Sequence, residues 1–119
     1  MSRFVLLFHD WPAGPRGSHC DLMLECAGVL RTWVIESLPH NWSAGKNIAA
    51  ERLPDHRLAY LDYDGPVSGD RGEVRRVDWG TFEFMHDSAD RCEVVLAGEV
   101  LRGTIELRRD GERWLLTLR

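Results

Sequence analysis

The sequence predicts an all-β protein, a small antiparallel β-barrel with at most one or two short helices. Seven or eight short runs rich in β-branched and aromatic residues follow one another along the 119 residues, separated by turn residues. No long stretch shows the apolar period of about 3.6 residues that marks a helix, and no repeat of about 20 to 50 residues is present. Closure into a barrel is favoured because it leaves no exposed sheet edge.

The first three strands are expected at residues 3–8, 18–26 and 29–36. Two prolines and two glycines within residues 10–17 end the first run, because proline cannot donate to a strand ladder. Residues 27–28, Ala-Gly, join the second and third runs by a short turn. These two strands should therefore form a hairpin.

The middle of the chain has the least regular pattern. Residues 37–46 have the composition of a loop, with room for one helical turn. Residues 47–53 fit either a strand or a helix on periodicity alone, and residues 54–72 form a connection rich in turns. The fold class therefore rests on the two ends of the chain.

The last third of the chain is predicted to be strands. Residues 73–84 should form two short strands that meet at Trp79 and Gly80, and a helix in residues 85–90 would be an addition to the barrel. Asp-Gly at residues 110–111 lies between alternating runs, which is a strong hairpin signal. The strands expected after residue 90 are 92–98, 100–110 and 113–119.

Composition predicts a single domain, residues 1–119, and argues against general electrostatic binding of nucleic acid, since the formal net charge is -4. The apolar run near the start has only five residues, too few for a signal peptide or a membrane span. We therefore expect a cytoplasmic protein without membrane contact. Its three cysteines, Cys20, Cys26 and Cys92, contain no CxxC pair and are expected to be free thiols.

One short stretch carries chemistry on a single strand face. His19 and Asp21 are two residues apart, so their side chains point to the same side of a strand. His9 ends the preceding strand, and a compact connection would bring it beside them. Two imidazoles and one carboxylate form a site for a divalent transition metal. The spacing alone leaves an alternative open, in which His9 is a surface residue and the other two only hydrogen-bond each other.

Other polar and aromatic residues have two interpretations from their positions alone. His56 and Tyr60 are either surface and packing residues or parts of a site in the turn-rich connection. The basic residues near that connection are either solvated or able to hold a phosphate; they are Lys46, Arg52 and Arg57. The sequence has no Walker-type glycine loop and no nucleophile elbow, so the reaction classes that depend on them lose support.

Several stretches together resemble one known family. "HCDLMLECAGVLRTWVI" is similar to "HYDLRLExDGVLKSWAV", "PDHRLAYLDYDGPV" to "EDHPLDYADFEGVI", and "DWGTFE" to "DRGTWE". By this likeness, which covers nearly the whole chain, the protein is identified as a member, in stand-alone form, of the 3'-phosphoesterase domain family of bacterial DNA ligase D.

The resemblance implies a barrel whose concave face holds manganese, or else zinc or another divalent transition metal. It implies an enzyme that removes 3'-phosphates or 3'-ribonucleotides from DNA ends before ligation in end joining. By the same resemblance, His9, His19 and Asp21 are the metal ligands, His56 lies against the phosphate, and Tyr60 is an active-site tyrosine. DNA 3' ends, and polymerase and ligase on separate chains, are the expected partners.

The sequence also departs from the family. Met23 stands where the family has a phosphate-contacting arginine, and the sequence begins at the first strand without the family's polar amino-terminal arm. The loop after His9 is longer than usual and carries Arg16, which we expect, with Arg52 and Arg57, to recover part of the substrate-binding charge. We expect slow removal of 3'-phosphate and poor excision of a ribonucleotide. The alternatives are a catalytically impaired module that binds nucleic-acid ends or a repair partner and, with less support, a small-molecule phosphatase.

Overall fold

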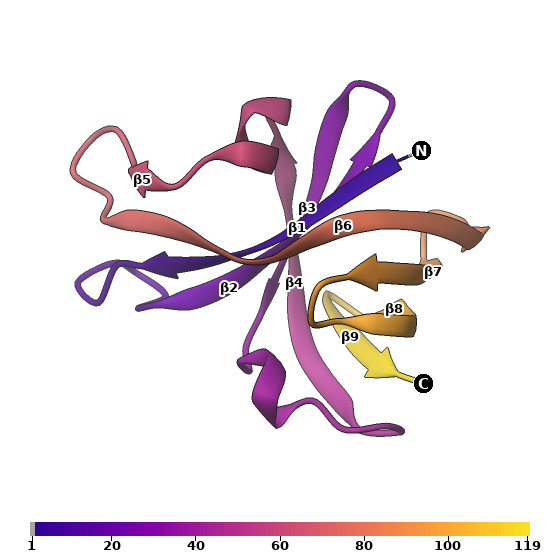
Figure 1. Cartoon of the computed structure of the whole chain (residues 1–119). Coiled ribbons are helices and arrows are strands. Elements are labelled where there is room, and N and C mark those ends of the chain that lie inside the picture. Colours follow the sequence, from indigo (N-terminus) through magenta and orange to yellow (C-terminus); the bar gives the residue numbers. More distant parts are fainter. Residues whose placement is uncertain (1) are drawn as a thin grey trace.

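The computed structural model describes residues 2–119, in which eight strands close into an antiparallel barrel (Figure 1). The order around the barrel is β1-β2-β3-β4-β9-β8-β7-β6, and β6 pairs back onto β1. The barrel strands are β1 (Ser2–Asp10), β2 (His19–Cys26), β3 (Val29–Ile35), β4 (Asn47–His56), β6 (Glu73–Asp87), β7 (Arg91–Gly98), β8 (Arg102–Asp110) and β9 (Arg113–Leu118). The remaining elements are two 3-10 turns, η1 (Pro39–Asn41) and η2 (Leu58–Asp62), and a two-residue strand, β5 (Gly65–Pro66). The predicted fold class is confirmed.

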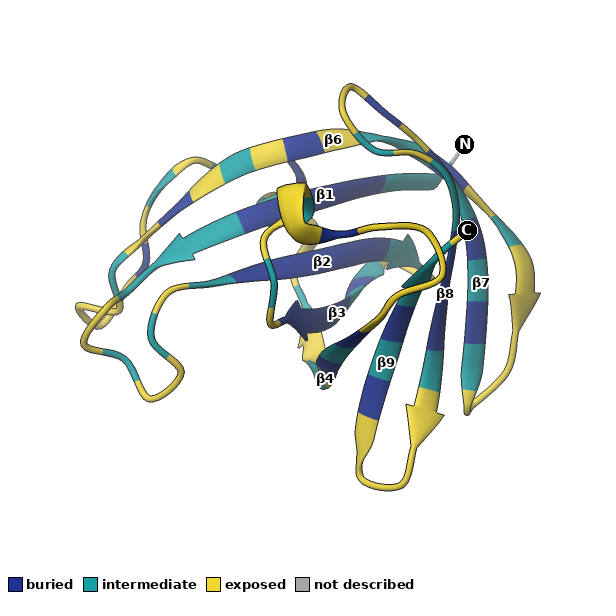
Figure 2. Ribbon diagram, turned by 90° about the horizontal axis from the view of Figure 1, so that it is seen from below, coloured by how far each residue is buried: buried dark blue, intermediate teal, exposed yellow. Residues whose placement is uncertain are grey.

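Alternating apolar residues fill the inside of the barrel. On β1 and β2 the inward residues include Phe4, Leu6 and Leu22, which are almost completely buried. Trp33 and Trp114 meet edge to face, with ring centroids 5.7 Å apart. Figure 2 shows this alternation as buried segments that interrupt the more exposed parts of the strands. The interior is therefore a packed core, and any site must lie on the outer face or at the rim.

The turns at both predicted hairpins have the backbone that their residues favour. Ala27 and Gly28 both have positive φ, 54° and 81°, and connect the paired residues Cys26 and Val29. Two consecutive positive φ values match the twist of the flanking strands. Gly111 has φ 66° between β8 and β9. Both hairpin predictions are confirmed.

The prediction of two strands within residues 73–84 is wrong, because β6 runs unbroken for 15 residues. Gly80 lies inside the ladder: a Cβ there would be 2.1 Å from the carbonyl oxygen of Ala97. The glycine therefore permits close strand contact and does not end the strand. The strand continues through residues 85–87, so no helix forms there, and residues 47–53 belong to strand β4.

A second, smaller apolar cluster lies between the outer wall formed by β1, β2, β3 and β6 and the segment of residues 57–72. It consists of Val5, Leu7, Met23, Leu30, Leu61, Val67 and Val74. Two polar contacts fix the covering segment: Asp62 pairs with Arg3 at 2.7 Å, and Asp64 Oδ1 accepts the backbone N–H of Arg76 at 2.7 Å. The covering segment thus has a defined position over one wall of the barrel.

Across residues 2–119, no helix is long and apolar enough to cross a membrane. All three cysteines are free thiols in the structure, and Cys20 and Cys92 are buried.

Candidate metal centre

The end of the β1–β2 hairpin brings the three predicted metal ligands together. His9 pairs directly with His19, and Leu7 pairs with Asp21 in the same antiparallel register. Because alternate residues share a face, all three polar side chains lie on the outer side of the wall, opposite the core. One potential ligand atom from each of His9, His19 and Asp21 lies within 4.8 Å of the others.

Backbone carbonyls fix which nitrogen of each imidazole carries the proton. His9 Nε2 lies 2.7 Å from the carbonyl oxygen of Arg71, and His19 Nδ1 lies 2.9 Å from that of Gly17. A carbonyl oxygen can only accept, so each of these nitrogens donates. The lone pairs are therefore on His9 Nδ1 and His19 Nε2. This is the arrangement of metal-binding histidines, whose second nitrogen typically donates to a carbonyl or carboxylate.

The carboxylate of Asp21 lacks compensation in its surroundings. The residue is 5% exposed, and its Oδ1 is a buried oxygen without a hydrogen-bond partner. The same oxygen lies 3.2 Å from His19 Nε2. Contact with Asp21 raises the pKa of His19 above its ordinary value, although desolvation opposes this. A lone pair facing a carboxylate requires a cation between them, either a proton or a metal ion, so the residues present fit a divalent metal.

A small cavity of about 70 Å³ opens beside this cluster. His56, from the end of β4, and Tyr60, from η2, line its other side. The two rings meet edge to face with centroids 5.7 Å apart. His56 Nδ1 is 2.9 Å from the carbonyl oxygen of Pro54, which leaves Nε2 free. The structure thus brings five predicted site residues, from the four elements β1, β2, β4 and η2, to one place.

The three arginines expected to bind substrate occupy different places. Arg57 lines a hollow next to the cavity, together with Tyr60. Arg16 lines another hollow, of about 460 Å³, beside His19, and its guanidinium pairs with Glu51. Arg16 therefore lies beside His19, and Arg57 lies beside Tyr60.

Arg52 is not brought to this site. Its guanidinium lies 4.7 Å from the ring centroid of Trp33 and donates to the carbonyl oxygens of Thr32 and Leu53. It also pairs with Asp55 at 3.1 Å and lines a different cavity, of about 420 Å³. Successive side chains of a strand point to opposite faces. Because the preceding residue of β4, Glu51, points to the outer face, Arg52 points to the other one.

One residue beside the candidate ligands was missed from the sequence. Arg71 lines the cavity but lies in a turn between two glycines, where nothing local distinguishes it from a surface residue. Trp11 is different, because a tryptophan in a loop is a candidate for stacking on a base from its position in the sequence alone. In the structure it stacks on His9, with ring centroids 5.6 Å apart.

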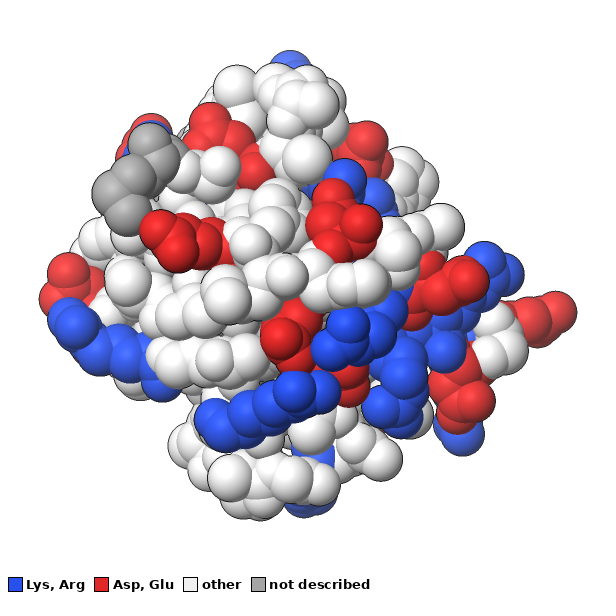
Figure 3. Space-filling view, turned by 90° about the vertical axis from the view of Figure 1, so that its right-hand side faces the viewer, with Lys and Arg blue, Asp and Glu red and all other residues white. Residues whose placement is uncertain are grey.

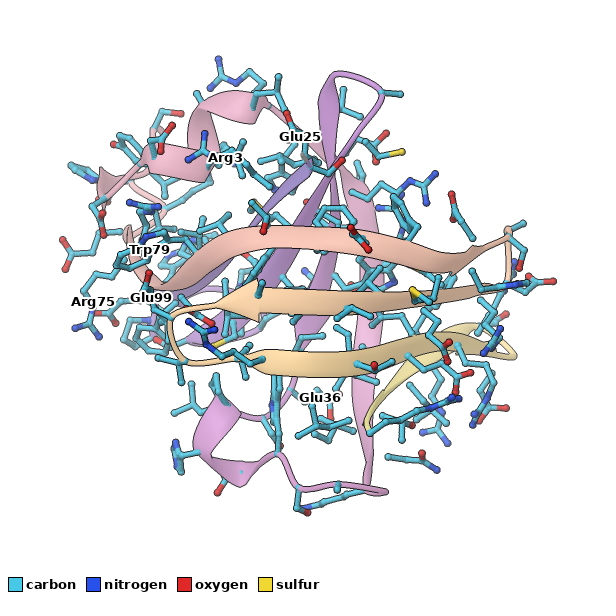
Figure 4. All side chains as sticks on the ribbon, turned by 45° about the vertical axis from the view of Figure 1, so that its right-hand side comes forward. Arg3, Glu25, Glu36, Arg75, Trp79 and Glu99 are labelled. Carbon is cyan, nitrogen blue, oxygen red and sulfur yellow. The ribbon has the colours of Figure 1, made fainter. Side chains whose placement is uncertain are left out.

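Two acidic residues within the quoted motifs have structural roles. Glu25 Oε1 accepts the backbone N–H of Arg3 at 2.9 Å, at the opposite end of the β1–β2 pair, where Figure 4 labels both residues. Asp78 in β6 is 1% exposed and accepts four backbone N–H groups. Those N–H groups belong to Trp79, Glu99, Val100 and Leu101. The motifs therefore combine site residues with residues that hold the barrel.

Comparison with known proteins identifies the family of the chain. Residues 9–113 match the family model described as the DNA ligase D 3'-phosphoesterase domain. The chain is also 38% identical over 109 residues to the multifunctional non-homologous end joining DNA repair protein LigD of Mycobacterium tuberculosis. That match covers 84% of this chain and 14% of the length of the relative. The matched family region includes all three candidate ligands, together with His56 and Tyr60.

Proposed function

Because the chain belongs to the DNA ligase D 3'-phosphoesterase domain family, we propose that it removes 3'-phosphates from DNA ends during end joining, with the help of a divalent metal. The observation that carries this proposal is the buried, unpartnered oxygen of Asp21 beside two correctly oriented imidazoles. A phosphate ester in the adjoining cavity would contact this cluster on one side and His56 on the other.

The metal would be held by His9 Nδ1, His19 Nε2 and Asp21 Oδ1. Imidazole ligands favour manganese or zinc over magnesium, and we propose manganese. When bound, such an ion supplies polarisation of a phosphoryl oxygen and activation of a water molecule.

His56 is proposed to contact the phosphate and not the metal. Its Nδ1 proton is committed to the carbonyl oxygen of Pro54, so only Nε2 faces new partners. In the imidazolium form, Nε2–H donates to a phosphoryl oxygen and stabilises the charge that develops there. Tyr60 packs against the ring of His56 and holds its plane toward the cavity.

We propose that the substrate is chiefly the 3'-phosphate monoester. Met23 is an apolar, buried residue that lines the cavity, where it offers no charge-assisted hydrogen bond. Cleavage of a 3'-ribonucleotide requires that a sugar also be positioned, and the cavity of about 70 Å³ has little room for it. Excision of a ribonucleotide should therefore be the slower reaction.

The test is release of inorganic phosphate from a DNA primer that ends in a 3'-phosphate, with and without manganese. We expect metal-dependent release, lost in Asp21→Asn and kept in Asp90→Asn, a matched change at an exposed aspartate. His56→Ala should lose activity while its manganese affinity, measured by calorimetry, stays nearly intact. Equal loss of both would contradict the role given to His56, and faster cleavage of a 3'-ribonucleotide primer would contradict the substrate preference.

A second candidate function is binding of DNA ends without catalysis. The apolar Met23 and the pairing of Arg16 with Glu51 favour it, because both reduce the charge available to a phosphate. Tight binding of a 3'-phosphate primer without turnover under manganese, zinc or magnesium would support this candidate and exclude the enzyme.

A further inference from the structure

The cavity beside the candidate metal ligands is lined by one basic residue that the proposed function does not use. Among residues 2–119, Arg71 is the one Lys or Arg residue that lines this cavity. Met23, on the same face as Asp21, is 1% exposed and carries no charge. A phosphate here would lie near the Asp21 carboxylate, and a nearby cation would reduce their repulsion.

A tight turn fixes Arg71 against the end of β1. The N–H of Val67 donates to the carbonyl of Gly72 at 2.8 Å, and Asp70 and Gly72 have positive φ of 56° and 72°. A Cβ at Gly72 would lie 2.2 Å from the carbonyl oxygen of Asp10, so the turn approaches the strand closely. The backbone carbonyl of Arg71 in turn accepts the Nε2 proton of His9.

The guanidinium of Arg71 is oriented by neutral groups. Its Nε donates to the carbonyl oxygen of Ser68 at 2.7 Å, and its Nη2 donates to Ser68 Oγ at 3.2 Å. These contacts use two of the five N–H donors of a guanidinium and leave three. None of the ion pairs within residues 2–119 involves Arg71, whereas Arg16 and Arg52 both pair with carboxylates. Arg71 is thus positioned and retains its capacity to bind an anion.

We propose that Arg71 binds the phosphoryl group of the substrate and supplies, from the turn at residues 67–72, the positive charge that β2 lacks at Met23. The proposal rests on the phosphoesterase function given above and adds a substrate-contacting residue to it. A guanidinium suits this role because it donates two parallel hydrogen bonds to a phosphate. The side chain and the backbone of Arg71 then have separate tasks: the first binds substrate and the second orients His9.

This separation makes the proposal testable, because a substitution removes the side chain and keeps the carbonyl. Arg71→Ala should reduce kcat/KM for the 3'-phosphate primer by about 10²- to 10³-fold, as expected for loss of one charged contact at a reacting centre. Calorimetry of the manganese-loaded protein should show that inorganic phosphate binds at least about tenfold more weakly, while manganese affinity changes little. Arg71→Lys should recover part of both losses.

Two further variants control for charge and position. Arg102→Ala, an equal change in net charge at an exposed residue of β8, should behave as the unaltered protein. Met23→Arg in the Arg71→Ala background should restore part of the phosphate affinity. Such rescue requires a shared phosphate position, and a purely structural role of Arg71 would not give it.

The outcomes separate the two proposals. If the unaltered protein cleaves the primer and Arg71→Ala matches it in rate and phosphate affinity, the role of Arg71 is refuted and the phosphoesterase function stands. If Arg71→Ala loses manganese affinity as strongly as phosphate affinity, Arg71 acts on His9 and does not contact the phosphate. If the unaltered protein neither cleaves the primer nor binds phosphate with any divalent metal, the proposed function itself fails.

Discussion

Two buried carboxylates on opposite walls of the barrel have contrasting surroundings. Asp21 on β2 and Glu106 on β8 both point outward, and three strands separate them in either direction around the barrel. Asp21 faces two imidazoles and keeps an oxygen without a partner. Glu106 is 6% exposed and pairs with three arginines. These arginines are Arg91, Arg108 and Arg119.

The difference in counter-charge distinguishes the candidate metal site at Asp21 from the structural network of arginines around Glu106. Arg91 lowers the pKa of Glu106 through its hydrogen bond, with further lowering from the other two arginines. Figure 3 shows one face of the molecule, where basic and acidic side chains are intermingled and not segregated by sign. A carboxylate surrounded by arginines already has its counter-charge, whereas Asp21 requires a cation. Burial alone therefore does not mark a functional carboxylate; the missing counter-charge does.

The largest contrast is expected from neutralising each carboxylate in turn. Asp21→Asn should reduce manganese affinity by at least about 100-fold, since even loss of a residue that supports a ligand costs about 10- to 100-fold. Its free energy of unfolding in the absence of metal should change little, because the amide removes an uncompensated buried charge. Glu106→Gln should keep manganese affinity. Calorimetry and urea unfolding of both variants measure this, and loss of metal binding in Glu106→Gln would remove the distinction.

A third buried carboxylate, Asp78, extends the comparison, because its hydrogen-bond donors are all backbone N–H groups. Asp78→Ala leaves four N–H groups without their acceptor, so we expect a loss of about 3 to 4 kcal/mol in the free energy of unfolding. Urea denaturation measures the loss. An exposed aspartate, Asp90, provides the control, and its change to Ala should have an effect within about 0.5 kcal/mol. Equal effects would show that the turn after β7 does not depend on Asp78.

The arginine network should also appear in the dependence of stability on pH. The folded pKa of Glu106 is lowered from its ordinary value of 4.5, so its contribution is fully present above about pH 4.5. That contribution is lost as the pH falls through the folded pKa. At neutral pH, the free energy of unfolding of the unaltered protein should therefore be about 1 to 2 kcal/mol higher than that of Glu106→Gln. This difference should shrink as the pH falls. A difference that grows toward low pH would contradict the assigned direction.

The smallest expected effect is on the reactivity of two cysteine thiols that point into the barrel, one from β2 and one from β7. Burial raises the pKa of both Cys20, on β2, and Cys92, on β7, to about 12. Both thiols should therefore resist alkylation at pH 8 in the folded protein, and Cys26, which is partly exposed, should react first. Mass spectrometry after timed alkylation checks this order. Rapid labelling of Cys20 alone would show that the wall carrying His19 and Asp21 opens more readily.

Local patterns predicted most of the barrel and failed at two kinds of position. Alternation and turn chemistry gave the hairpins at residues 27–28 and 110–111 and the outward direction shared by His19 and Asp21. The same signals misplaced a strand end at Gly80, because a glycine that allows close backbone contact has the same local pattern as one that ends a strand. Residues 47–53 stayed ambiguous, since their pairing partners lie far away in β3 and β9.

Sequence patterns were sufficient for the fold class and for the face of β2 that carries His19 and Asp21, and the family resemblance added His9, His56 and Tyr60. These follow from strand period and from short motifs, which are local properties. Contacts between distant segments place Arg71 at the wall of the cavity and turn Arg52 away to Trp33. They also bring the carbonyl of Arg71 to the imidazole of His9, whose tautomer it sets. Those outcomes depend on which distant segments the closed barrel brings into contact, and a guanidinium or a carbonyl has no sequence signature of its eventual neighbour.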